Sequence, residues 1–318
     1  MKKLYALVII MLLCQANYAQ PSLKNKVLLF ASFRDNGQDG LHLAYSRDGY
    51  KWTALKNDSS FITPTVSKDK LMRDPCIIKG GDGLFHMVWT VGWKDKGIGY
   101  ASSKDLVNWT EQKFIGVMQH EPEALNCWAP EIFYDAASKN YMVYWATTIP
   151  GRFGAGDTSG DDKYNHRIYY VTTKDFITFT TAKVLYDKGF NVIDATIQKV
   201  GNKYLLFLKD ETLEPVPQKN IRIATSYKLN KGYSAPSAAI TGKYWAEGPT
   251  AIKLNNKWIV YFDKYTQGKY GAVMSADLKN WKDISDEINF PKGTRHGTVF
   301  SISGQEFALL TTLTGNKQ

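Results

Sequence analysis

Cysteine is scarce in this chain, with 3 residues among 318. Cys14 lies in the N-terminal apolar run, which leaves only Cys76 and Cys127 in the rest of the chain. Two thiols can form at most one bridge, so no disulfide framework can hold this fold together. We expect two buried thiols, and the sequence leaves open whether Cys76 and Cys127 pair.

Long apolar runs are absent after the first 20 residues. The apolar run at 4–14 follows two lysines and precedes a small-residue cleavage site at Ala19, as in secretory signal peptides. It is too short to span a membrane. We therefore predict a signal peptide at 1–19 and an exported protein, periplasmic or extracellular. Lipoprotein anchoring through Cys14 is less favoured, because the bulky Leu13 stands where a small residue is expected.

Several chemistry-bearing motifs are missing as well. The sequence has no Gly-rich phosphate loop, no serine nucleophile elbow and no zinc-ligand spacing. The net charge is +10, of which Lys2 and Lys3 would leave with the signal peptide, and the other basic residues are dispersed. Dispersed charge does not track a phosphate backbone, so we expect no nucleic-acid partner. Mild attraction to an acidic polysaccharide remains compatible with the charge.

The chain does contain an internal repeat. A short element with Ser or Thr, then Asp, then an aromatic residue occurs at 45–52, 102–109, 172–179 and 274–281, with a degenerate fifth copy at 225–233. A strand-like run rich in aromatic and β-branched residues precedes each copy, and no long 3.6-residue period is present. Five copies of an all-β unit predict one five-bladed β-propeller domain over residues 20–318.

Each repeat also contains a strand candidate that begins near a polar residue. These strands lie in RDPCIIKG, WAPEIFYD, IDATIQKV, EGPTAIKL and RHGTVFSIS, with the polar residues Asp74, Glu131, Asp194, Glu247 and His296. We interpret them as the innermost strands of the blades. The strands at 27–52 lack such a partner, so we expect them to complete the blade that begins at His296 and to close the ring. Equivalent strand starts converge on one end of a propeller axis, and the five polar side chains should meet there.

The ordered set RDP, WAPE, IDA, EGP and RHG resembles glycoside hydrolase family 43, and it is most similar to the exo-acting α-L-arabinofuranosidases of that family. The resemblance implies that Asp74 is the general base and Glu247 the general acid. It implies that Asp194 tunes the acid and orients the substrate. Glu131 departs from the WAPD of many relatives and is assigned to substrate contact. His296 matches an axial histidine that lies beside a bound calcium or water.

The chemistry of an inverting glycosidase agrees with these roles. One carboxylic acid protonates the leaving oxygen and one carboxylate activates water, with about 6.5 to 9.5 Å between them. Gly248 and Pro249 would hold the acid Glu247 on a stiff turn. The acid must stay protonated near neutral pH, so we expect the charge of Asp194 to raise the pKa of Glu247. This chemistry requires no cofactor, and a structural calcium near the propeller axis remains an expectation from the resemblance.

The strand direction predicts which residues surround the site. If each inner strand begins at the active mouth, the turn after the second strand returns to that mouth. Trp93, Trp128 and Trp245 would then be able to stack on sugar rings, and we expect Arg295 and His296 to bind substrate with them. The loop at 149–167 is long and rich in Gly and Asp, which makes it a candidate wall of the pocket.

These observations predict an exported, inverting exo-glycosidase that releases α-L-arabinofuranosyl residues from arabinan or arabinoxylan. A β-xylosidase or a galactan-cleaving enzyme could use the same constellation. The alternative of a different class is a carbohydrate-binding propeller without catalysis, although all three acid positions are filled here. A retaining, fructan-processing enzyme would need its nucleophile in the first inner strand and carboxylates about 5.5 Å apart.

Overall fold

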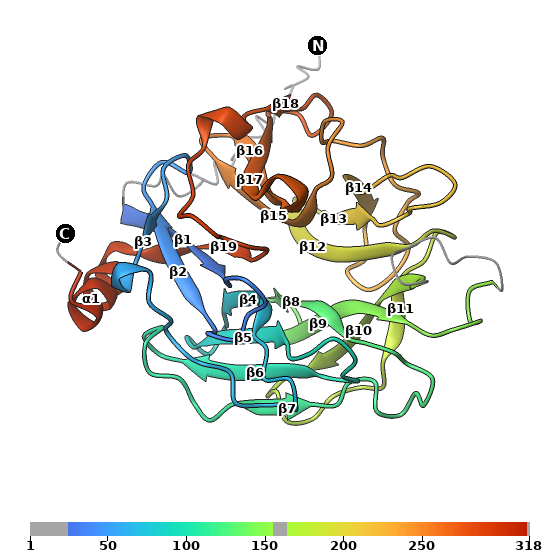
Figure 1. The fold of residues 1–318 in the computed structure, drawn as a ribbon, viewed down its shortest axis with the longest axis horizontal. Coiled ribbons are helices and arrows are strands. Elements are labelled where there is room, and N and C mark those ends of the chain that lie inside the picture. Colours follow the sequence, from blue (N-terminus) through green and yellow to red (C-terminus); the bar gives the residue numbers. More distant parts are fainter. Residues whose placement is uncertain (1–24, 155–163, 317–318) are drawn as a thin grey trace, which may run out of the picture.

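A computed structural model describes residues 25–154 and 164–316, and it contains five antiparallel sheets arranged around a common axis (Figure 1). From the axis outwards, the first three blades are β4 (Arg73–Lys79), β5 (Phe85–Thr90), β6 (Ile98–Ser103), β7 (Lys113–Ile115); β8 (Trp128–Asp135), β9 (Asn140–Thr148), β10 (His166–Thr173), β11 (Lys183–Tyr186); and β12 (Val192–Val200), β13 (Lys203–Asp210), β14 (Asn220–Ser226). The other two are β15 (Glu247–Leu254), β16 (Lys257–Lys264), β17 (Lys269–Ser275), β18 (Lys282–Asp283); and β19 (Thr298–Ser303), β1 (Lys26–Ser32), β2 (His42–Ser46), β3 (Thr53–Ala54). The predicted five-bladed β-propeller is therefore confirmed. The predicted signal peptide at 1–19, Cys14 and the middle of the loop at 149–167 lie outside the described residues.

The fifth blade joins the two ends of the described chain. Its inner strand β19 pairs with β1, with Leu29 opposite Phe300 and Phe30 opposite Val299. The strands β2 and β3 follow outwards, as the sequence predicts for residues 27–52. Main-chain hydrogen bonds between the last and the first strands therefore close the ring.

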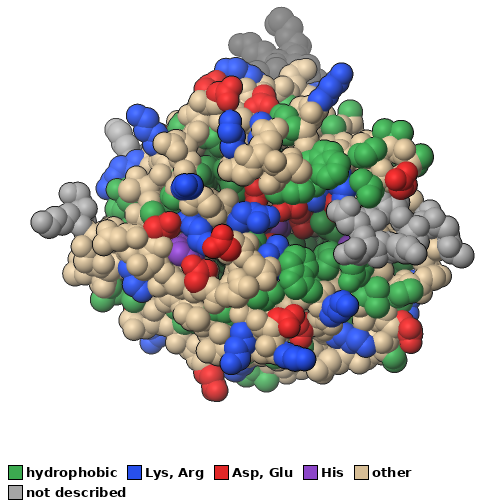
Figure 2. Space-filling model, viewed as in Figure 1, with side chains coloured by type: hydrophobic (Ala, Val, Ile, Leu, Met, Phe, Trp, Pro, Cys, Tyr) green, Lys and Arg blue, Asp and Glu red, His purple; other side chains and the backbone are tan. Residues whose placement is uncertain are grey.

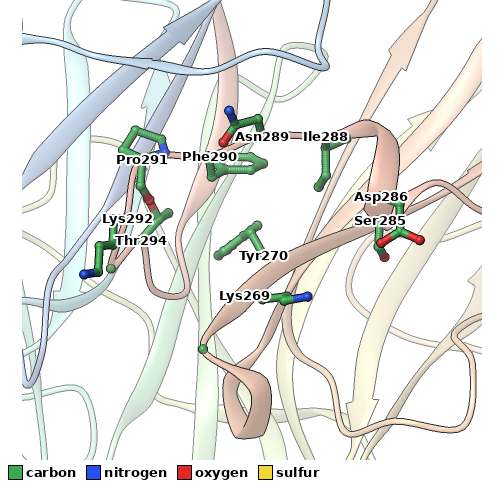
Figure 3. Close-up of a pocket in the computed structure, with 12 residues that line it drawn as sticks. Lys269, Tyr270, Ser285, Asp286, Ile288, Asn289, Phe290, Pro291, Lys292 and Thr294 are labelled. Carbon is green, nitrogen blue, oxygen red and sulfur yellow. The ribbon is translucent and has the colours of Figure 1, made fainter.

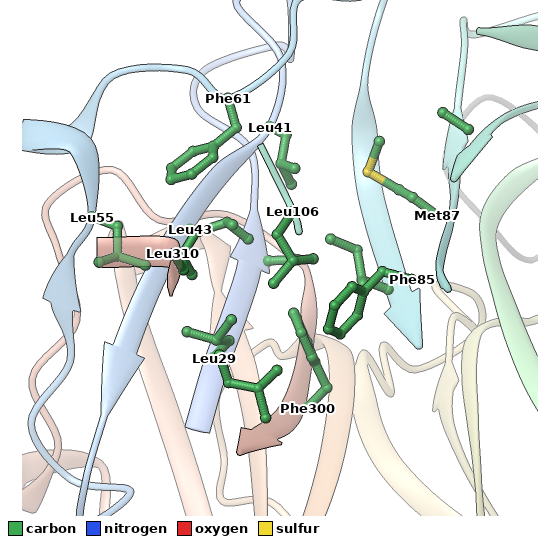
Figure 4. Close-up of a cluster of buried hydrophobic side chains, with 14 of the residues drawn as sticks. Leu29, Leu41, Leu43, Leu55, Phe61, Phe85, Met87, Leu106, Phe300 and Leu310 are labelled. Carbon is green, nitrogen blue, oxygen red and sulfur yellow. The ribbon is translucent and has the colours of Figure 1, made fainter. Parts of the chain in front are cut away.

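Continuous apolar runs form the second strand of each blade because both of its faces are buried. Successive side chains of a strand point to opposite faces, so neighbouring residues enter different seams between blades. Leu28 packs between the fourth and fifth blades, and Leu29 packs between the fifth and first. Figure 4 shows the second of these seams, where Leu29 and Phe300 approach Phe85 and Met87. Five such clusters occupy the five seams between adjacent blades.

The repeated Ser/Thr and Asp residues form the turn after the third strand of a blade. In the first blade, Ser103 Oγ accepts a hydrogen bond from the Leu106 amide, and Asp105 Oδ1 accepts one from the Val107 amide. Equivalent bonds are made by Ser46 and Asp48, Thr173 and Asp175, and Ser275 and Asp277. The degenerate copy at 225–233 begins in the last two residues of β14, and that blade has three strands where the others have four.

A short helix, α1 (Gly304–Thr314), follows β19 and was not expected from the sequence. It begins with a capping box between Ser303 and Glu306, and it buries Phe307 and Leu310 against the fifth blade. Three 3₁₀ turns complete the helical elements of the described residues, namely η2 (Lys56–Asp58), η4 (Tyr265–Gln267) and η5 (Ser285–Glu287). None of these helices is long and apolar enough to cross a membrane. Cys76 and Cys127 are buried and unpaired, as expected for two structural thiols.

Candidate active site

A β-bulge near the start of four inner strands shapes the candidate site. The register between the inner and second strands shifts after Arg73, Trp128, Ile193 and Glu247, leaving two residues unpaired each time. Three of these bulges contain proline at the second unpaired position, Pro75, Pro130 and Pro249. Proline has no N–H to donate to the ladder, so the RDP, WAPE and EGP motifs favour this break in pairing.

The first unpaired residue of each bulge has a left-handed backbone. Asp74 and Asp194 both have φ of 51°, Ala129 has 48° and Gly248 has 60°. Aspartate tolerates this conformation better than most residues, and glycine adopts it freely. At Gly248 a side chain would also collide with the ring of His296, because an added Cβ would lie 2.4 Å from two ring atoms. The close approach of His296 therefore requires glycine here.

The bulges correct the prediction that the five polar residues occupy equivalent positions. Asp74 and Asp194 are the left-handed residues of their bulges, whereas Glu247 is the residue before its bulge and Glu131 the residue after. A bulge turns consecutive side chains towards the same side of a strand. Acidic groups from different positions can thus reach the axis, but at different depths.

Asp74 pairs with His296 at the centre of the site. Its Oδ1 lies 3.3 Å from His296 Nδ1, and its Oδ2 accepts a hydrogen bond of 2.8 Å from Thr90 Oγ1. Burial alone would raise the pKa of Asp74, but the charge of His296, with Arg73 and Thr90, holds the pKa at about 2. Asp74 is therefore an ionised carboxylate at neutral pH.

His296 also lies near Asp194, with Nδ1 3.9 Å from Asp194 Oδ2. Burial would lower the pKa of His296, yet Asp194 and Asp74 raise it to about 9, so the imidazole is charged. Asp194 Oδ2 accepts the Gly248 amide at 3.0 Å. Burial raises the pKa of Asp194 to about 6 against the opposing effects of His296 and Lys209, with Glu247 and Asp74 acting in the same direction as burial.

Glu247 lies between two cations. Its Oε2 is 3.1 Å from Lys209 Nζ, and its Oε1 is 3.3 Å from Arg295 Nη2. Burial would raise the pKa of Glu247, but Lys209, His296 and Arg295 together lower it. The expectation that Asp194 raises this pKa is therefore wrong for the substrate-free site.

The structure adds four charged residues to those that the sequence singled out. Lys209 contacts Glu211 Oε2 at 2.6 Å, and Glu211 Oε1 in turn contacts Lys219 Nζ at 2.5 Å. On the other side of Glu247, Arg295 Nε contacts Asp263 Oδ2 at 2.7 Å. A sequence signal for two of them exists, because Lys209 and Asp263 are polar residues next to the last position of the apolar strands β13 and β16. They pair with Ile193 and Glu247, near the starts of the inner strands. Arg295, predicted to bind substrate, joins two carboxylates here.

Glu131 is buried at the axis, at 7 % exposed, and hydrogen bonds from three blades surround it. It accepts hydrogen bonds from Thr196 Oγ1 at 2.9 Å, Thr298 Oγ1 at 3.1 Å and Tyr144 OH at 3.3 Å, which come from the third, fifth and second blades. Burial raises the pKa of Glu131 to about 7 against these hydrogen bonds and the charge of His296. Its predicted contact with substrate stays a prediction, and its partners give it a role in tying three blades together.

Glu131→Gln is expected to change how stability depends on pH. The folded-state pKa of about 7 exceeds the ordinary 4.5, so the folded protein binds more protons than the unfolded chain between pH 4.5 and 7. The free energy of unfolding of the native protein should therefore fall as pH rises through this window, by on the order of 3 kcal/mol from this group. The variant should lack this part of the fall. Urea unfolding at pH 5 and pH 8 measures it, with the exposed Glu123→Gln as control, and equal slopes in the variant and native proteins would contradict the argument.

Aromatic side chains lie on two sides of the charged centre. Trp93 is 43 % exposed and meets Trp128 edge to face, with ring centroids 5.7 Å apart. The Arg73 guanidinium lies 4.4 Å from the centre of the Trp93 ring. On the Glu247 side, the ring centroids of Trp245 and Tyr265 lie 6.1 Å apart. In the space-filling view, a hollow near the centre of the face contains acidic and basic side chains and has hydrophobic side chains beside it (Figure 2).

A separate cavity of about 350 Å³ lies in the fourth blade and the segment that leads to the fifth. Figure 3 shows Tyr270 at its centre, with Phe290 and Pro291 above it and Asp286 at the side. None of the predicted catalytic residues lines it. We assign this cavity no part in the chemistry.

Metal binding gains no support from the side chains in the described ranges. Among residues 25–154 and 164–316, no group of three or more His, Cys, Asp and Glu side chains is placed to hold a metal ion. The nitrogen of His296 that faces the carboxylates is engaged with Asp74, and calcium prefers oxygen ligands. These residues do not fit a calcium site by themselves, so we assign no step to a metal, and the structural calcium stays a prediction.

Carboxylates gathered at one end of a five-bladed propeller axis, beside exposed aromatic rings, define a glycoside hydrolase of the propeller class. The chain belongs to the glycoside-hydrolase-43-related family, described as "Probable glycosyl hydrolase domain", which matches residues 25–308. The resemblance to family 43 is thereby confirmed. An α-L-arabinofuranosidase of Bifidobacterium longum subsp. longum is 23 % identical over 206 residues, which cover 57 % of this chain and 19 % of that protein. This chain thus spans about a fifth of that relative's length.

Solved structures show the same fold. A thermostable family-43 glycoside hydrolase has a TM-score of 0.55 at 17 % identity, covering 73 % of this chain and 80 % of its own. An α-L-arabinofuranosidase from Clostridium thermocellum has a TM-score of 0.55 at 14 % identity, covering 86 % and 93 %. A family-43 β-1,3-galactosidase has a TM-score of 0.56 at 13 % identity, covering 79 % and 54 %. At these identities the likeness shows the fold and leaves the sugar open.

Proposed function

We propose that this protein is an exported, inverting exo-α-L-arabinofuranosidase that acts on side chains or ends of plant arabinan or arabinoxylan. The observation that carries the proposal is the convergence of Asp74, Asp194 and Glu247 around His296, from three different blades. The arabinofuranosidase named among its relatives supports the choice of sugar. Export rests on the predicted signal peptide at 1–19, and exo action rests on the family resemblance.

The geometry supports Asp74 as the general base. An ionised carboxylate held by His296 and Thr90 is oriented to take a proton from water, which then attacks the anomeric carbon. The bond to the leaving oxygen breaks while that oxygen receives a proton from Glu247. Asp194 accepts the Gly248 amide and so positions the bulge that carries Glu247. The water oxygen replaces the leaving oxygen at the anomeric carbon from the opposite face, and the configuration inverts.

Glu247 must bind a proton before it can act as the acid. Lys209 and Arg295 favour its ionised form in the empty site. A bound sugar removes water and brings the glycosidic oxygen to the carboxyl group, which favours the neutral form. We therefore propose that Glu247 takes up its proton when substrate binds.

The experiment that tests the function is hydrolysis of aryl α-L-arabinofuranoside, β-D-xyloside and β-D-galactoside, followed by proton NMR of the first sugar released. We expect release from the arabinofuranoside, with the β-anomer of arabinose appearing first. Release of the α-anomer would contradict inversion and favour a retaining enzyme. Release from another sugar would keep the mechanism and change the substrate. No release from any of the three, nor from arabino-oligosaccharides, would favour a binding protein.

A further inference from the structure

Two buried lysines share one glutamate beside the proposed acid. Lys209 is 2 % exposed, and its Nζ contacts both Glu211 and Glu247. Lys219, fully buried, contacts the other oxygen of Glu211. Arg295 and Asp263 continue the series beyond Glu247. Six groups of alternating sign thus follow one another, namely Lys219, Glu211, Lys209, Glu247, Arg295 and Asp263.

We propose that Lys209, held by Glu211, is a positioning residue that fixes the Glu247 carboxyl group and sets the upper pH limit of its action as proton donor. The proposal rests on the proposed function, since it takes Glu247 as the general acid. Lys209 acts through Glu247, to which it donates a hydrogen bond of 3.1 Å. Glu211 keeps Lys209 charged and in place when Glu247 becomes neutral.

The charge balance of these six groups determines whether a substitution favours or opposes protonation of Glu247. The six groups sum to zero when Glu247 is ionised, and they carry one excess positive charge when it is protonated. A buried excess charge is unfavourable, so removing a cation should favour the proton on Glu247, whereas removing Glu211 should oppose it. The charged and titratable groups that influence Glu247 come from β12, β13, β16, β17 and the start of the fifth blade, namely Asp194, Lys209, Asp263, Tyr270, Arg295 and His296.

Two single variants should therefore shift the alkaline limb of the pH profile of kcat, which reports the substrate-bound enzyme, in opposite directions. Lys209→Met should move this limb to higher pH by about one unit, because an opposite charge at this distance lowers a carboxyl pKa by at least that much. Glu211→Gln should move it to lower pH, because Lys209 and Lys219 then lack their shared counter-charge. The double variant Lys209→Met/Glu211→Gln restores the balance, and its limb should return close to that of the native enzyme.

A purely structural role predicts a different result, namely lower activity in both single variants with an unmoved limb or with shifts in the same direction. Either outcome would overturn the proposal. Lys257→Met, an exposed lysine on β16, is the matched control and should leave the profile unchanged. If Lys209→Met does not fold, the other two variants still test the proposal. The alkaline limb of Glu211→Gln must shift to lower pH, and that of the double variant must stay close to the native limb.

A substrate-free measurement separates this proposal from the proposed function. The side-chain ¹³C resonance of Glu247, assigned by its loss in Glu247→Gln, reports protonation directly. Its midpoint should rise in Lys209→Met and fall in Glu211→Gln, even if no glycoside in the panel is cleaved. An unmoved midpoint in an active enzyme would refute the role of Lys209 and leave the glycosidase assignment intact.

Discussion

Asp74→Asn is expected to lower kcat/KM by about 10³- to 10⁴-fold on every glycoside, whatever its leaving group. The amide keeps the shape of the side chain and the hydrogen bond from Thr90, but it cannot accept a proton from water. Activation of water is needed for poor and good leaving groups alike, so both kinds of substrate should be affected. Rates on aryl arabinofuranosides whose phenols span several pKa units measure this.

The control for Asp74→Asn is Asp286→Asn, an exposed aspartate in η5. Its activity should equal that of the native enzyme. The loss of Asp74 also leaves the charged His296 with Asp194 as its nearest carboxylate, so thermal unfolding of both variants must be compared. A folded Asp74→Asn protein that retains activity within tenfold of the native level would remove Asp74 as the base and favour a different catalytic arrangement.

The sequence could predict the fold because its main signal is local and repeated. Apolar runs such as 84–91 and 257–265 must be buried on both faces, and the Ser/Thr–Asp turn marks the end of the third strand in four blades. Closure by β19 and β1 followed from the unpaired strands at the N-terminus. The helix α1 was not predicted because it is 11 residues long and buries only Phe307, Leu310 and Thr311. So short an apolar stripe leaves little periodicity to detect.

The acidic residues that gather at the axis could be predicted from the sequence, but their burial and electrostatics could not. Relative to the bulge, Asp74 lies one residue further along its strand than Glu247 does. Glu131 follows its bulge, and its side chain is more buried than those of Asp74 and Glu247. A single extra residue in a strand decides which side chain faces the axis, and a sequence pattern does not fix that register. In the sequence, Lys209 is only a polar residue near the end of an apolar strand. Only pairing between strands and packing between blades bring its ammonium group to Glu247.

Buried charge explains why the pKa directions differ from the expectation. A model with Asp194 as the only neighbour of Glu247 predicts a raised pKa for the acid, because like charges disfavour ionisation. Two cations reverse the sign at Glu247, while burial raises the pKa of Asp194 to about 6. In the empty site, Asp194 therefore binds a proton at higher pH than Glu247 does. The substrate must change this order if Glu247 is to donate the proton.

Glu247→Gln is expected to separate substrates by their leaving groups. On arabino-oligosaccharides, whose leaving alkoxide needs a proton, kcat should fall by about 10²- to 10⁴-fold. On a dinitrophenyl arabinofuranoside, which departs as a stable phenolate, the loss should stay below about tenfold. The alkaline limb of the pH profile should also disappear on the activated substrate, because the group that must be protonated is gone. Steady-state kinetics on both substrates from pH 5 to pH 9 measures these effects.

Lys209 and Arg295 make the choice of glutamine important for this test. Truncation to alanine would leave two buried cations facing an empty space, and the resulting disorder would lower activity on every substrate. Glutamine keeps the shape of the side chain and one oxygen for these cations, but it cannot donate a proton as a carboxylic acid does, so a difference between leaving groups then reports acid catalysis. Equal losses on both substrates, in a variant that melts like the native protein, would show that Glu247 positions the sugar. The proton would then have to come from Asp194, whose pKa of about 6 already suits the task.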